Sequence, residues 1–125
     1  MKALVFNGPR ELEICEWEEP TVHSGEVLLE VLACGICGTD MHVYQGMPAS
    51  WPVPGVRGHE IVGRVLTSAD DIHGFKKGER VVVQPLIYCG VCRACRAGRT
   101  NLCYKTKLIG GEFPGGFAER ISVPA

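Results

Sequence analysis

Four cysteines in one short segment constrain this chain more than any other feature of its sequence. Cys89, Cys92, Cys95 and Cys103 lie in YCGVCRACRAGRTNLC with C-x2-C-x2-C-x7-C spacing, and the other three cysteines all precede residue 38. Seven cysteines scattered at random rarely cluster in this way. The segment therefore predicts either a metal site or a disulfide framework.

The start of the chain favours the metal site. The opening MKALVFNGPRELEICEWEEP has one apolar run, which breaks at Asn7-Gly8-Pro9 before the sequence turns acidic, unlike a secretory signal. No apolar run approaches the roughly 18 residues that would suggest a membrane span. We therefore expect a cytoplasmic protein with no membrane partner. Thiols stay reduced in that compartment, and an odd total of seven is awkward for disulfide pairing.

Zinc is the metal that the spacing favours. Four thiolates close a tetrahedral zinc site with no position left for substrate, which is typical of structural zinc. The alternative is an iron–sulfur cluster, but in the ferredoxin run the last cysteine follows after three residues and precedes proline. Here it follows after seven residues and precedes Tyr104. The segment has too little apolar surface to fold alone, and zinc binding would supply on the order of 10 kcal/mol.

The cysteine segment also carries Arg93, Arg96 and Arg99. These arginines form either a solvated rim that partly balances the thiolates or a basic contact for a partner. The whole chain has a net charge of -1, which gives no general attraction to nucleic acid or anionic lipid. We therefore expect no nucleic-acid partner, and a nucleic-acid zinc ribbon is disfavoured.

The rest of the chain predicts a mainly β domain. It is 46% hydrophobic and 22% charged, as in ordinary globular proteins. Glycine and proline separate short apolar runs that predict strands, and the only helical stretch is Thr39 to Gln45. The strand segments are MKALVF, ELEICEWEE with Leu12 and Ile14 alternating against glutamates, GEVLLEVLACGIC with Val27, Leu29, Val31 and Ala33 on one face, EIVGRVLT, GERVVVQPL and GGFAERISVPA. Many short strands predict a β barrel or sandwich, and no β-α-β alternation of a nucleotide-binding fold is visible.

A second pair of stretches, CGICGTDMH and PGVRGHE, contains a further candidate metal site. Catalytic zinc takes three protein ligands and keeps a fourth position exchangeable, and Cys37 and His59 are ligand types of this kind. The alternative is a buried small residue and a hydrogen-bonded core histidine. Thr39 and His42 would then be a helix cap and a solvated imidazole.

Taken together, these motifs resemble the zinc-dependent medium-chain alcohol and polyol dehydrogenases. CGICGTDMH, GHEIVG, GERVVV, the cysteine segment and GGFAE occur in the same order and spacing, and the resemblance runs from residue 1 to 125. It implies the N-terminal, GroES-like catalytic domain, a partly open β barrel with short helices and a zinc-binding lobe at about 88–104. It also implies roles for particular residues: Cys37 and His59 as catalytic-zinc ligands, Glu60 either as an adjacent residue that supports these ligands or as an alternative ligand, Cys89, Cys92, Cys95 and Cys103 as structural-zinc ligands, and Thr39 and His42 as a proton relay. Cys34 and Cys15 have no ligand role in the pattern and are assigned to the core.

The resemblance further implies an oxidoreductase that transfers hydride between NAD or NADP and a small-molecule secondary alcohol, polyol or hydroxy amino acid. Complete members carry a Rossmann domain, and no G-x-G-x-x-G follows a strand here. We therefore expect a fragment, residues 1–125, that is inactive alone and belongs to a homo-oligomeric parent. The alternative is a zinc-binding module without catalysis. The substrate cleft could be lined by Tyr44, Met47 and Trp51. The alternative for Trp51, which lies among prolines, is a purely structural role.

Overall fold

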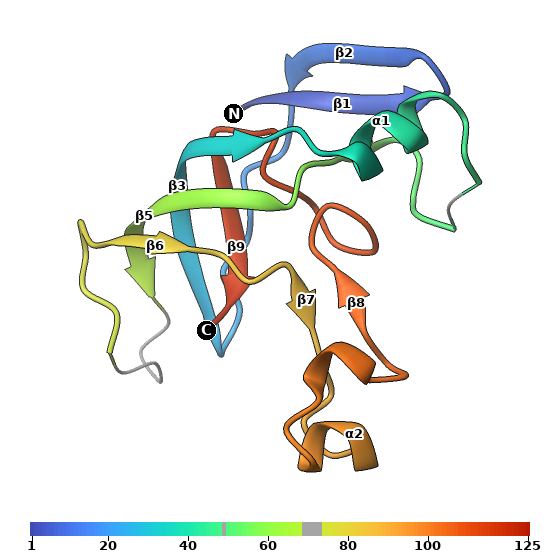
Figure 1. The fold of residues 1–125 in the computed structure, drawn as a ribbon. Helices are drawn as coiled ribbons and strands as arrows, with labels where there is room; N and C mark the ends of the chain where they lie inside the picture. The colour runs from blue at the N-terminus through green and yellow to red at the C-terminus, as the bar shows by residue number, and fades with distance from the viewer. Residues whose placement is uncertain (49, 69–73) are drawn as a thin grey trace.

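A computed structural model describes residues 1–48, 50–68 and 74–125. In these residues the chain forms nine β-strands, two short α-helices and one 3-10 helix (Figure 1). In chain order they are β1 Lys2–Gly8, β2 Glu11–Glu16, β3 Glu26–Gly35, α1 Gly38–Tyr44, β4 Gly55–Val56, β5 Glu60–Ser68, β6 Arg80–Val82, β7 Leu86–Ile87, α2 Arg93–Arg96, the 3-10 helix η1 Thr100–Leu102, β8 Lys107–Leu108 and β9 Arg120–Pro124. The prediction of a mainly β chain is confirmed.

The strands form three sheets, none of which closes into a barrel. The largest has the order β6-β5-β3-β9, the second has the order β2-β1-β4, and β7 pairs with β8. Every pairing between the described strands is antiparallel. In Figure 1 the β7–β8 ribbon leads away from the large sheet to the segment with the four cysteines. This arrangement confirms the partly open architecture with a separate lobe.

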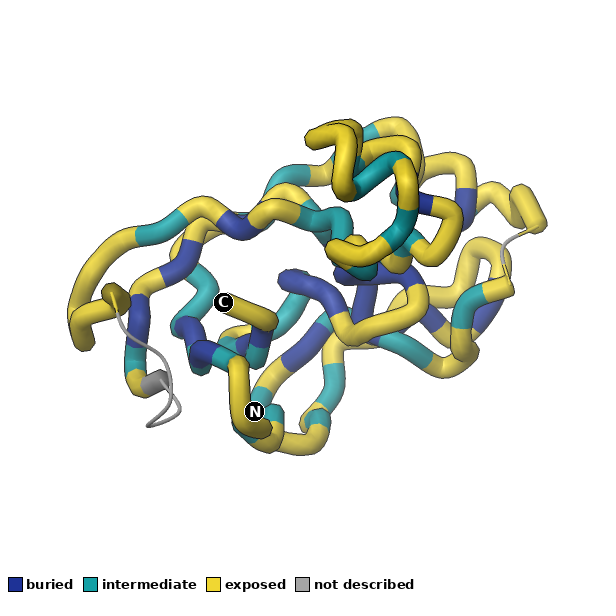
Figure 2. Tube along the Cα trace, turned by 90° about the horizontal axis from the view of Figure 1, so that it is seen from below, coloured by how far each residue is buried: buried dark blue, intermediate teal, exposed yellow. Residues whose placement is uncertain are grey.

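The buried side chains form two clusters, one for each of the larger sheets. The larger cluster includes Leu29 of β3 and Ile61 of β5, and the smaller is built around Val5 of β1 and Val56 of β4. Figure 2 shows these buried segments toward the middle of the molecule, with exposed loops around them. The valine-rich alternation of the sequence therefore supplies the core, as β-branched side chains pack well on a pleated surface.

Two predicted strand faces are wrong in part. The register of β3 against β5 shifts between Val31 and Ala33, so Ala33 is exposed and Cys34 packs against the core. A bulge adds one residue and turns every later side chain to the other face. In the edge strand β2, Leu12 and Ile14 are exposed, because Cys15 lies on the other face of the sheet, where it packs against the smaller buried cluster.

The helices are short. The predicted helix at 39–45 is confirmed as α1, whereas α2 and η1 in the cysteine segment were not predicted. Elements of four and three residues are too short to show helical periodicity in a sequence. None of the helices in the described parts of the chain has the length and apolar character needed to cross a membrane.

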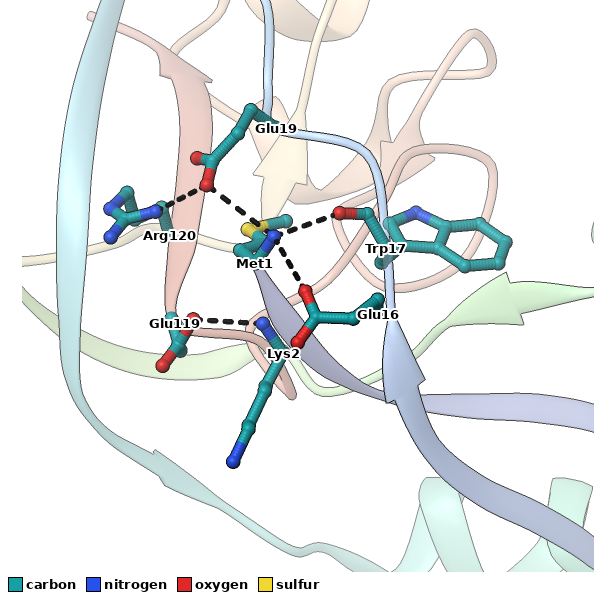
Figure 3. Close-up of polar contacts among 7 residues, drawn as sticks. All are labelled: Met1, Lys2, Glu16, Trp17, Glu19, Glu119 and Arg120. Atoms are coloured by element: carbon teal, nitrogen blue, oxygen red, sulfur yellow. Dashed lines mark hydrogen bonds and ion pairs between the residues drawn. The ribbon is translucent and has the colours of Figure 1, made fainter.

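A polar cluster ties the first strand to the last one (Figure 3). The amino group of Met1 donates to the carbonyl oxygen of Trp17 at 3.0 Å and lies 3.4 Å from a carboxylate oxygen of Glu19. Glu19 also accepts a hydrogen bond from Arg120 of β9. One carboxylate thus joins the start of β1 to the large sheet.

Candidate metal centres

The four clustered cysteines converge at one point in the lobe between β7 and β8. All four sulfur atoms lie within 4.8 Å of one another. The Sγ atoms of Cys92 and Cys95 are 3.4 Å apart, and those of Cys89 and Cys103 are 3.6 Å apart. Zinc–sulfur bonds of about 2.3 Å in a tetrahedron separate the sulfurs by about 3.8 Å. The cluster therefore has the size of a four-thiolate zinc site.

Backbone N–H groups stabilise negative charge on one sulfur of this cluster. The N–H groups of Cys89 and Lys105 donate to the Sγ atom of Cys103 at 3.5 and 3.4 Å. These bonds lower the pKa of Cys103 to about 6, and the bond from Cys89 has the larger effect. Burial, followed by hydrogen bonding to Cys92, raises the pKa of Cys95 to about 12. Four adjacent sulfurs cannot all ionise without a positive charge among them, and a divalent ion supplies that charge. The donor set fits zinc.

A second cluster forms where α1 begins. Cys37 is the N-cap residue of α1, and its Sγ atom accepts a hydrogen bond from the N–H group of Thr39 at 3.3 Å. The Nε2 atom of His59, just before β5, lies 3.0 Å from the same sulfur. The structure thus brings together the two residues that sequence analysis proposed as ligands. Thr39 is not the helix cap, since Cys37 occupies that position.

Asp40 is the third member of this cluster, and sequence analysis did not identify it. The ligand atoms of Cys37, Asp40 and His59 lie within 4.8 Å of one another. One carboxylate oxygen of Asp40 accepts from the N–H group of Cys37 at 3.0 Å, and the other lies 3.8 Å from Nδ1 of His59. A carboxylate behind a ligating histidine fixes the ring and its tautomer. The C-x-x-D spacing before a predicted helix, which is that of a capping box, was the available signal.

The other predicted site residues lie around this cluster. Glu60, the first residue of β5, is exposed and lies outside the Cys37–Asp40–His59 group, so its ligand role stays a prediction. Thr39 and His42 are both exposed on α1. Residues three apart on a helix share a face, so these two side chains can face one solvent region.

Two further cysteines take no part in either cluster. Cys34 packs against the larger core cluster, and burial raises its pKa to about 11. Cys15 packs against the smaller core cluster. Neither thiol belongs to a group of candidate metal ligands among the described residues. The structure therefore agrees with the assignment of both residues to the core.

Residues 23–125 match the family model of the alcohol dehydrogenase GroES-like domain. The L-galactonate-5-dehydrogenase of Escherichia coli K12 is 40% identical over 99% of this chain. The L-threonine 3-dehydrogenase of Pseudoalteromonas atlantica is 44% identical over 86% of it. The chain spans only 36% and 33% of the lengths of these two relatives.

The fold is also similar to solved structures. A thermostable alcohol dehydrogenase from Pyrobaculum aerophilum, solved with cobalt and zinc bound, matches with a TM-score of 0.92 and 36% identity. The match covers 99% of this chain and 39% of that one. A metal-bound dehydrogenase thus contains a domain with the architecture described above.

Proposed function

Since this chain belongs to the family of alcohol dehydrogenase GroES-like domains, we propose that it is the catalytic domain of a zinc-dependent oxidoreductase. The parent protein would transfer hydride between NAD(P) and a secondary alcohol, polyol or hydroxy amino acid. In this proposal residues 88–104 form the structural zinc lobe. In this proposal an NAD(P)-binding Rossmann domain would belong to the rest of the parent protein.

The difference between the two clusters carries the proposal. Cys89, Cys92, Cys95 and Cys103 offer four sulfurs, which close a tetrahedral site. Cys37 and His59 offer one sulfur and one nitrogen, with Asp40 behind the histidine ring. A mixed donor set that leaves positions for other ligands is typical of catalytic zinc. When bound, zinc supplies a Lewis acid and the nicotinamide supplies the hydride acceptor.

The exposed face of α1 would transfer the hydroxyl proton of the substrate to solvent. Thr39 follows the sulfur ligand by two residues, and its hydroxyl is able to accept the proton of the substrate alcohol while donating its own. His42 lies one turn further along and is exposed, so its ring can exchange that proton with water. Loss of Thr39 should therefore be more harmful than loss of His42, because water can replace the terminal group of a relay.

The relatives narrow the substrate class. Their names specify L-galactonate and L-threonine, two carboxylic acids that carry a secondary hydroxyl group. Within the proposed class, a hydroxy acid is therefore the first substrate to test. A cytoplasmic location belongs to the same proposal, because the lobe needs four reduced thiols.

The test uses the complete polypeptide that contains these residues. Reduction of NAD+ and NADP+ is followed with L-threonine, L-galactonate and unsubstituted polyols. We expect turnover with at least one of them, and we expect Cys37→Ala and His59→Ala to abolish it while one zinc ion per chain is retained in the lobe. Thr39→Ala should lower kcat strongly with both zinc ions retained.

The alternative is a zinc-binding module without catalysis. It would be supported if the complete polypeptide held a single zinc ion and reduced neither cofactor with any of these alcohols. Full turnover by Cys37→Ala, with its zinc content measured, would contradict the proposed role of the Cys37–Asp40–His59 cluster.

A further inference from the structure

Arg57, two residues before His59, is a buried cation without a carboxylate partner among the described residues. Its exposed fraction is 6%, and its Nε atom is buried with no hydrogen-bond partner in the described structure. It borders a cavity of about 180 Å³ whose other lining residues are apolar. Burying a charge without a counter-ion is costly, so the groups that surround the guanidinium must hold it firmly.

Those groups come from three segments that are far apart in the sequence. Nη2 of Arg57 donates to the carbonyl oxygen of Pro52 at 2.6 Å, and Nη1 donates to that of Gly111 at 3.3 Å. The guanidinium carbon lies 5.1 Å from the ring centre of Phe6 in β1 and 5.7 Å from that of Trp51. Both rings are within cation–π distance. One side chain therefore joins β1, the segment before β4 and the loop between β8 and β9.

The backbone beside this side chain is held against the same loop. The carbonyl oxygen of Arg57 accepts from the N–H group of Phe117 at 2.9 Å, and that of Gly58 accepts from Gly116 at 2.8 Å. The two segments run so close that a side chain at Gly115 would collide with the Arg57 carbonyl group. The position of residues 57 and 58 thus depends on the 109–117 loop, and Arg57 is bonded to that loop through Gly111.

His59 is the next residue, and its ring must reach a sulfur from another segment. Its Nε2 atom lies 3.0 Å from Cys37, and its Nδ1 atom faces Asp40 at 3.8 Å. A histidine ring can meet both groups only if its backbone is placed correctly. We propose that Arg57 is a positioning residue for the metal cluster, which acts by fixing the backbone of residues 57 and 58 so that His59 meets Cys37.

This inference rests on the metal site proposed above, and the test distinguishes the two. The complete polypeptide is loaded with cobalt in place of zinc, and the affinity and visible absorption of each cobalt site are measured by competition with a chelator. Arg57→Met keeps the length and apolar stem of the side chain but removes both carbonyl bonds. We expect it to weaken cobalt binding at Cys37 and His59 by about tenfold to a hundredfold, as for other residues that orient ligands. The absorption band of that site should also shift.

Three comparisons distinguish a specific effect on the Cys37 site from a general loss of stability. The four-cysteine lobe of the same molecule should keep its cobalt affinity in Arg57→Met. Val56→Ala, which removes buried apolar volume next to Arg57 but none of its bonds, should lower Tm and leave both cobalt sites unchanged. Arg57→Lys keeps the charge but cannot span both carbonyl groups, so it should restore only part of the affinity.

Two results would overturn the inference. One is an unchanged affinity and spectrum of the Cys37 site in Arg57→Met. The other is an equal weakening of both cobalt sites, which would show that Arg57 serves only overall stability. If the unsubstituted protein bound no cobalt at Cys37 and His59, the proposed function would fail and the inference would fail with it.

Discussion

The Nε2 atom of His59 lies 3.0 Å from the Sγ atom of Cys37, although the two residues are 22 positions apart in the sequence. The pairing of β3 with β5 explains this proximity. Gly35 is opposite Glu60 at the end of that ladder. Cys37 follows Gly35 and His59 precedes Glu60, so both residues lie just beyond the same end of the paired strands. The register of two central strands therefore determines whether the candidate metal ligands Cys37 and His59 meet.

This relationship predicts a selective loss of metal. Cys37→Ala should remove one zinc ion per chain and leave the zinc ion of the lobe, because the two clusters share no residue. Zinc content is measured by native mass spectrometry of the complete polypeptide. Cys34→Ala is the matched control, since it removes a nearby thiol whose pKa is raised to about 11 by burial, and it should keep both ions. Loss of zinc in the control instead would show that the wrong cysteine was assigned.

The roles of Asp40 and Glu60 can be distinguished by replacing each carboxylate with the corresponding amide. Asp40→Asn removes the charge behind His59 but leaves an oxygen to accept from the N–H group of Cys37, so the helix cap is kept. We expect zinc affinity at the cluster to fall by about tenfold to a hundredfold. Glu60→Gln should change it much less, since Glu60 lies outside the group. Affinities are measured by chelator competition. The reverse order of effects would favour Glu60 as a ligand, which is one of the two roles that the family resemblance implies for it.

The thiol of Cys103 should titrate at unusually low pH when zinc is absent. Hydrogen bonds from the backbone of Cys89 and then Lys105 lower its pKa from the ordinary 9.0 to about 6. The native state thus favours the ionised thiol, and this contribution to stability is complete above about pH 9 and is lost as the pH falls to about 6. The contribution of Cys95 changes with pH in the opposite direction. Its pKa is raised, so its contribution to stability is complete below about pH 9 and is lost as the pH rises toward 12.

The measurement is a pH titration of thiolate absorbance in the reduced, zinc-free protein. A step with a midpoint near pH 6 should be present in the unsubstituted protein and absent in Cys103→Ser. Melting temperatures over pH 6 to 9 should show a weaker pH dependence in the variant, because the thiol that drives it is gone. A first thiol step near pH 9 in both proteins would contradict this prediction and would show that the zinc-free lobe loses the backbone hydrogen bonds to Cys103.

Residue types and spacing predicted two candidate metal centres, but only the fold revealed how their residues meet. Four cysteines within one short segment can converge through local turns of the chain, so the lobe could be predicted from spacing alone. Cys37 and His59 meet through long-range strand pairing, which no local pattern encodes. Asp40 was missed because its role depends on where the His59 ring lies. The exposed position of Ala33 was missed because a bulge depends on the partner strand.

Gly58, which connects Arg57 to His59, has a constrained position. Its φ angle is +89°, and a Cβ atom there would lie 2.7 Å from the Sγ atom of Cys34 and from the ring of Phe117. Gly78 has the same φ angle of +89° but no atom within 4 Å of the corresponding position, so it is a matched control. Gly78→Ala should cost about 1 to 2 kcal/mol from backbone strain alone. Gly58→Ala should cost several kcal/mol and lower Tm well below that of the control, because it adds a collision in the packed core. It should also release zinc from Cys37 and His59 at lower chelator concentration, whereas Gly78→Ala should not. Equal melting temperatures for the two variants would show that the close packing around Gly58 is not a constraint on the site.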